Sequence, residues 1–151
     1  MHISNDIFFE NVKAELAEGR DVRIRVVGTS MKPTFKTEVD SVVITSKGVS
    51  DLSPRDIVLF NLKGQVKLHR IIKIQGDELY IRGDGIYFGP FERCSKADVI
   101  GVVSGGTLFG EKFRFKGKGF FFRTYSFLYV ASYPLRALLV RIHLRLKKNT
   151  K

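Results

Sequence analysis

The feature that most constrains the fold is a series of short β-rich segments between residues 22 and 103 that no long helical pattern interrupts. The segments are bounded by Gly, Pro, Asp or Ser, as at Lys63-Gly64 and Gly76-Asp77, which are typical turn residues. We therefore predict a mainly β fold, an antiparallel sandwich or barrel and not a doubly wound sheet. The expected strands are Val22–Val27, Asp40–Thr45, Ile57–Asn61, Val66–Ile74, Leu79–Arg82 and Val99–Val103.

The length of 151 residues fits one domain, and a hydrophobic content of 44% is enough for a core. We expect an N-terminal helix in residues 1–20, because Phe8, Val12 and Leu16 recur at intervals of four. After this helix we expect a β domain over residues 21–115 and a tail over residues 116–151. The single cysteine, Cys94, excludes an intrachain disulfide and a multi-cysteine zinc site.

The net charge of +11 is unevenly distributed along the chain. Residues 111–151 hold 11 lysine and arginine residues and one acidic residue, whereas the preceding residues are nearly neutral. The positive charge is thus a property of the tail, and the function of the body has to be interpreted separately.

The most informative segment is Val27-Gly28-Thr29-Ser30-Met31-Lys32-Pro33-Thr34, which follows a predicted strand and places a hydroxyl group in a turn. A serine held there can present its Oγ atom while its own backbone N–H points to the same place. Acyl transfer needs this combination of nucleophile and oxyanion donor. The alternative interpretation is an ordinary turn.

This segment and those after it resemble the signal peptidase I family, which is related in fold to the self-cleaving LexA-type repressor domains. The matching segments occur in the family's order over residues 26 to 103. After the serine segment they are Asp40–Ile44, Pro54–Phe60, Lys67-Leu68-His69-Arg70-Ile71-Ile72, Ile81-Arg82-Gly83-Asp84-Gly85 and Asp98–Val103.

The resemblance implies a coiled, barrel-like β domain and a serine endopeptidase that cleaves a peptide or protein precursor without a metal or nucleotide cofactor. It implies that Ser30 is the nucleophile, that His69 is the general base where bacterial members carry Lys, and that Asp84 orients this base. It also assigns the oxyanion hole and the wall of the substrate pocket to Gly28, Thr29, Met31 and Pro33.

The residues themselves support this assignment in part. A neutral imidazole, with an intrinsic pKa of about 6.5, can accept a serine proton near neutral pH, whereas a lysine would need a strongly lowered pKa. By residue type alone, His69 on a strand and Asp84 between two glycines would more often be structural, so their place in the matching segments selects them. Cys94 has no motif around it and is interpreted as an incidental or buried thiol.

Two departures from the family pattern concern access and the oxyanion hole. Members usually carry an N-terminal membrane anchor, whereas residues 1–20 show a polar helix and no signal-peptide pattern. Many bacterial members have a serine two residues before the nucleophile, where this chain has Gly28. The oxyanion hole would then depend on backbone donors or on Thr29.

The tail allows more than one interpretation. The run from Phe120 to Val140 has the length of a membrane span but contains Arg123, Pro134 and Arg136, so a span is only weakly supported. After Pro134, leucines at helical spacing are flanked by cations, which suits an anionic membrane surface in contact with residues 120–148. The alternative is a helix packed on the β domain. We expect a cytoplasmic or peripherally membrane-associated protein.

Two other functions remain open. A self-cleaving regulator of the LexA type would need a DNA-binding domain and a cleavable Ala-Gly or Cys-Gly linker, which the sequence does not show. A non-catalytic module would use the basic tail to bind a membrane or nucleic acid. Because the charge lies in a leucine-striped segment, lipid is favoured over nucleic acid as its partner.

Overall fold

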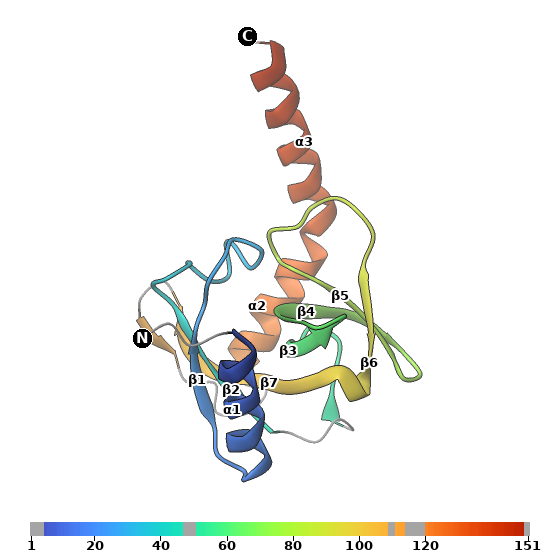
Figure 1. Ribbon diagram of the computed structural model, residues 1–151. Coiled ribbons are helices and arrows are strands. Elements are labelled where there is room, and N and C mark those ends of the chain that lie inside the picture. Colours follow the sequence, from blue (N-terminus) through green and yellow to red (C-terminus); the bar gives the residue numbers. More distant parts are fainter. Residues whose placement is uncertain (1–4, 47–50, 109–110, 114–119, 150–151) are drawn as a thin grey trace.

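The computed structural model describes residues 5–46, 51–108, 111–113 and 120–149. In these residues the chain forms one sheet, an N-terminal helix and a C-terminal helical arm (Figure 1). The helices are α1 (Asn5–Ala17), α2 (Phe120–Ala131) and α3 (Tyr133–Asn149), and the strands are β1 (Val22–Arg25), β2 (Ser41–Thr45), β3 (Ile57–Leu62), β4 (Gln65–Gln75), β5 (Glu78–Arg82), β6 (Glu92–Ser95), β7 (Val99–Leu108) and β8 (Glu111–Phe113).

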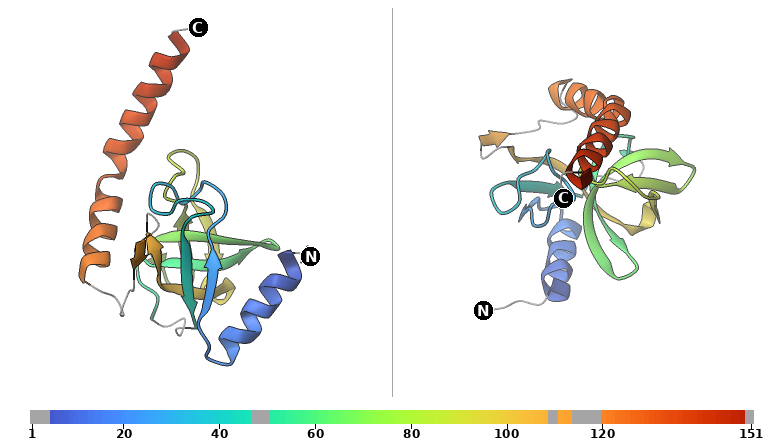
Figure 2. Two further views of the ribbon diagram at one scale, coloured as in Figure 1. Left: turned by 90° about the vertical axis from the view of Figure 1, so that its left-hand side faces the viewer. Right: turned by 90° about the horizontal axis from the view of Figure 1, so that it is seen from above.

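The sheet is antiparallel and has the strand order β1-β2-β7-β3-β4-β5-β6, with β8 also paired to β7. It is strongly coiled, so that β1 and β2 cross the direction of β4 and β5 (Figure 2). Within the described residues β1 and β6 do not pair, and the sheet is not closed into a barrel. The prediction of a mainly β fold is therefore confirmed, whereas the sheet stays open where we expected a barrel-like form.

Each of the six expected strands is present with its ends shifted by a few residues. The strands β6 and β8 were not expected. Strand β6 has the sequence Glu-Arg-Cys-Ser, which shows no apolar alternation, and it pairs with β5 while burying Cys94. Tertiary pairing, and not local propensity, forms this strand.

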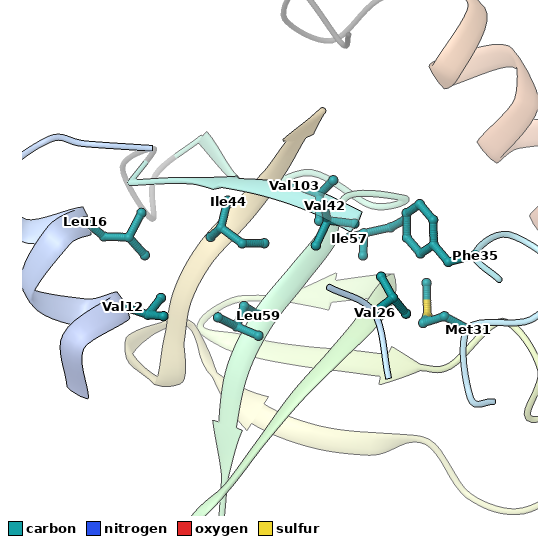
Figure 3. Packing of buried hydrophobic residues seen from close by; sticks show 10 residues of the cluster. All are labelled: Val12, Leu16, Val26, Met31, Phe35, Val42, Ile44, Ile57, Leu59 and Val103. Carbon is teal, nitrogen blue, oxygen red and sulfur yellow. The ribbon is translucent and has the colours of Figure 1, made fainter. Parts of the chain in front are cut away.

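One hydrophobic cluster connects α1 to the segment that carries Ser30 (Figure 3). At one end, Val12 and Leu16 of α1 pack against the sheet. At the other end, Met31 and Phe35 are buried beside Val26. The loop of residues 26–40, here called the serine loop, is thus anchored in the core by its own side chains.

The helices α2 and α3 form an arm whose first half lies against the body and whose second half extends away from it (Figures 1 and 2). Tyr129 of α2 is 8% exposed, and its hydroxyl donates to the backbone oxygen of Asp84 at 2.5 Å. Along α3 the leucine and isoleucine side chains at 135, 138, 139, 142, 144 and 146 are 45–63% exposed. The first half of the arm is therefore packed on the β domain, whereas contact of the second half with a membrane stays a prediction.

The run from Phe120 to Val140 is divided between α2 and α3 at Ser132. In the described part of the chain, no helix is both long and apolar enough to cross a membrane.

Two truncations test this division of the arm. Removing residues 138–151 should change the melting temperature by less than about 2 °C, because it removes exposed side chains. Removing residues 120–151 should lower it by several degrees, since the lost contacts of Tyr129 correspond to roughly 2–4 kcal/mol. Thermal unfolding followed by circular dichroism measures both. Equal melting temperatures for the full chain and both truncations would contradict a packed α2.

Candidate active site

The serine loop presents Ser30 at the surface of the sheet. Gly28 has a φ of 89°, a conformation that glycine adopts at little cost. The N–H of Phe35 donates to the carbonyl of Met31 at 3.0 Å, which closes the turn below Ser30. The backbone N–H of Ser30 donates none of the hydrogen bonds found among the described residues. Its role as an oxyanion donor stays a prediction.

Gly83 is the point at which Ser30 and His69 come together. A Cβ atom on Gly83 would lie 2.5 Å from the carbonyl oxygen of Ser30 and 3.0 Å from Nε2 of His69. Real Cβ contacts are not this short, so the approach requires glycine. The N–H of Gly85 donates to the same Ser30 oxygen at 2.7 Å and holds the loop in place.

The structure therefore brings the backbone of Ser30 close to the imidazole of His69. No hydrogen bond joins Ser30 to His69 in the described part of the chain. Catalytic hydrogen bonds are often long without substrate and tighten in the reacting complex.

The carboxylate that contacts His69 belongs to Glu92, the first residue of β6. His69 is 4% exposed, and its Nδ1 lies 2.6 Å from Oε2 of Glu92. The other carboxylate oxygen accepts a hydrogen bond from Nζ of Lys67 at 2.7 Å. With Nδ1 held by Glu92, Nε2 is the nitrogen on the side of Gly83 and Ser30. This is the order of nucleophile, base and orienting acid found in catalytic triads.

The charge of Glu92 is maintained by its partners. Partial burial acts to raise the pKa of Glu92, but the hydrogen bonds from Lys67 and His69 outweigh burial and lower this pKa below the ordinary value. Glu92 is thus a carboxylate at neutral pH. Such a charge beside Nδ1 stabilises an imidazolium ion.

Asp84 occupies a different position from the one we expected. It is 4% exposed, and its carboxylate accepts hydrogen bonds from Nε and Nη2 of Arg70 at 2.8 and 2.7 Å and from Oγ1 of Thr34 at 2.5 Å. These three residues form what we call the Arg70–Asp84–Thr34 clamp. The contact with His69 that we predicted for Asp84 is made by Glu92, because the carboxylate of Asp84 is held by the clamp.

The other expected site residues divide into two groups. Gly28, Thr29 and Pro33 lie exposed on the serine loop, where an incoming peptide could reach them. Met31 is buried in the core and supports the turn from below. Cys94 is also buried, and burial raises the pKa of its thiol to about 11, so a thiolate is disfavoured at neutral pH.

The search of protein-family models and that of curated proteins both found no match to this chain.

The residue that sequence reasoning missed is Glu92. Its segment, Phe91-Glu92-Arg93-Cys94, has neither a strand pattern nor a recognisable site motif. One signal could have indicated Glu92. If Cys94 is taken as a buried strand residue, its neighbours Glu92 and Arg93 belong to the same strand. That signal is weak because β6 has four residues.

Two matched substitutions separate the roles of the two carboxylates. Asp84→Asn leaves the buried Arg70 without its counterion and should lower the free energy of unfolding by about 3–5 kcal/mol. Glu92→Gln removes a half-buried charge at the edge of the sheet and should cost less than about 2 kcal/mol. Urea unfolding measures both. A greater loss in Glu92→Gln than in Asp84→Asn would show that the clamp is not the structural element described here.

Proposed function

We propose that this chain is a serine endopeptidase of the signal peptidase I type, which cleaves a peptide or protein precursor through an acyl-Ser30 intermediate. The observation that carries the proposal is the meeting of Ser30 and Nε2 of His69 at Gly83, with Nδ1 of His69 on Glu92. The coiled antiparallel sheet and the matching segments of the sequence support the finer assignment to the signal peptidase and LexA fold.

The proposed reaction follows from these positions. Nε2 of His69 accepts the proton of the Ser30 hydroxyl while Oγ attacks the scissile carbonyl carbon. The backbone N–H of Ser30 donates to the oxyanion, and Glu92 stabilises the imidazolium. The imidazolium then gives its proton to the leaving amine. A water molecule, deprotonated by His69, hydrolyses the acyl ester and restores Ser30.

Two alternatives use the same residues differently. A self-cleaving regulator of the LexA type would cut its own chain, so its rate would not depend on protein concentration. A non-catalytic module that binds a membrane through the tail would gain nothing from a glycine that admits Ser30 to the imidazole of His69. The close approach at Gly83 and the Glu92 contact therefore favour the peptidase.

We also propose that the arm associates peripherally with an anionic membrane surface through residues 120–148. The exposed leucines of α3 and its cations, which include Arg141 and Arg145, support this association. No acidic residue lies in α3 to oppose it. Nucleic acid is not the expected partner.

The peptidase proposal is tested by comparing peptide termini in cells that express the wild type, Ser30→Ala or Ser46→Ala. Ser46 is exposed and remote from the motif, which makes Ser46→Ala the matched control. New termini should appear with the wild type and Ser46→Ala, and should fall below a few per cent with Ser30→Ala because the nucleophile is absent. Identical termini in all three strains would end the assignment.

The termini found in this way provide a peptide for pH profiles of kcat/KM. Activity should rise with pH as the imidazole of His69 loses its proton, and His69→Ala should be inactive at every pH. Because Glu92 holds Nδ1 of His69, Glu92→Gln should weaken the hold on the imidazole and reduce the maximal rate by about tenfold or more.

Lys67→Met is the control for a lysine base. If Lys67→Met were inactive while His69→Ala kept its rate, the base would be Lys67. An unchanged maximal rate in Glu92→Gln would remove Glu92 from the proposed triad.

A further inference from the structure

A cavity of about 240 Å³ lies where the α2–α3 arm meets the end of β5. Its wall is mostly apolar and includes Phe91, Tyr129 and Val130. Two arginines also line it, Arg82 from β5 and Arg136 from α3. A largely apolar cavity with a few converging polar groups is the usual form of a ligand site.

Arg82 is only 9% exposed and is held by its surroundings. Its Nη2 donates to the carbonyl of Gly89 at 2.5 Å, Nη1 donates to the hydroxyl of Tyr133, and Phe91 lies 4.1 Å from the guanidinium. Its Nε is buried and has no hydrogen-bond partner among the described residues.

Arg136 is arranged in a similar way. Its Nε donates to Oγ of Ser132 at 3.1 Å and Nη2 donates to the carbonyl of Tyr129 at 2.5 Å, while the Tyr129 ring lies 3.4 Å from the guanidinium. Its Nη1 is buried without a partner in the described part of the chain. Each arginine thus has one buried nitrogen without a hydrogen-bond partner among the described residues.

The charges around the cavity do not cancel. Neither Arg82 nor Arg136 forms a salt bridge with any described residue. The carboxylate of Asp84, which also lines the cavity, is held by Arg70 and Thr34. Burying the charge of Arg82 without a counterion is unfavourable, and Arg136 beside the cavity is partly buried. An anion bound between Arg82 and Arg136 would offset this cost.

We propose that the cavity binds the phosphate of an anionic phospholipid between Arg82 and Arg136, with the glycerol and first acyl carbons against Phe91, Tyr129 and Val130. The planar guanidinium group matches phosphate geometry. A lipid is favoured over a peptide carboxylate because Arg136 lies at the base of α3, where the exposed leucine stripe and cations begin. The inference deepens, and rests on, the proposed membrane association, and it is independent of the peptidase reaction.

Isothermal titration calorimetry of the full chain tests the cavity without a membrane. The probes are dihexanoyl phosphatidylglycerol below its micelle concentration, inorganic phosphate, and a short apolar peptide with a free C-terminal carboxylate. The lipid should bind at one saturable site, and phosphate and peptide should each bind at least tenfold more weakly, because phosphate lacks the apolar part and the peptide lacks the phosphate.

Substitutions then locate the site. Arg136→Gln should weaken lipid binding at least tenfold, whereas Arg145→Gln, which removes the same charge from an exposed position on the same helix, should stay within twofold. Since Arg136 also holds α2, Val130→Phe is a second variant that fills the cavity and keeps its charge. It should abolish lipid binding.

The exposed stripe needs its own variant. Leu138→Ser combined with Ile142→Ser should weaken binding to vesicles that contain phosphatidylglycerol, yet leave the affinity for the short-chain lipid within twofold. If that affinity fell as well, the lipid would lie on the stripe and the cavity proposal would be overturned.

Other results would also overturn it. They are no saturable lipid binding, equal losses in Arg136→Gln and Arg145→Gln, full affinity in Val130→Phe, phosphate binding as tight as the lipid, or a peptide carboxylate that binds more tightly. The stripe variant could lose vesicle binding while the wild type shows no affinity for the short-chain lipid. The chain would then associate with the surface without a lipid site in the cavity.

Discussion

The Arg70–Asp84–Thr34 clamp is the interaction on which the site depends. Arg70 lies on β4 next to His69, Asp84 follows β5, and Thr34 belongs to the serine loop, so one buried carboxylate joins three segments that are distant in sequence. Asp84 also contacts the arm, because the hydroxyl of Tyr129 donates to the backbone oxygen of Asp84. The desolvation of this ion pair is costly, and its hydrogen bonds have to be complete for the pair to be tolerated.

The clamp also explains the close approach at Gly83. Holding Thr34 against Asp84 brings the carbonyl of Ser30 onto the backbone of residues 83 and 85, and a side chain at position 83 would meet both this carbonyl and His69. A structural ion pair and a missing Cβ atom together allow the backbone of Ser30 to lie close to the ring of His69. The geometry of the candidate site is therefore a consequence of packing at neighbouring residues.

The sequence predicted those parts of the structure that depend on local pattern. Strands such as β3 and β4 are rich in Val, Ile and Leu, and their alternation and turn residues locate them. Strand β6 has no such pattern, since it exists through pairing with β5, and Glu92 could not be found without it. Asp84 and Glu92 are both carboxylates near the base in the folded chain. Only the register of Ile81 opposite Glu92 brings the second one to Nδ1 of His69.

The arm also shows what the sequence pattern does not predict. Helical periodicity indicates an apolar stripe but not whether protein or lipid covers it. In α2 the decisive group is the Tyr129 hydroxyl, which donates to a backbone oxygen of the body, whereas in α3 the leucine side chains are more than half exposed. Arg136 lies at the junction, with its guanidinium against the ring of Tyr129. Arg136 and Tyr129 therefore connect the base of α3 to Asp84, the carboxylate at the centre of the clamp.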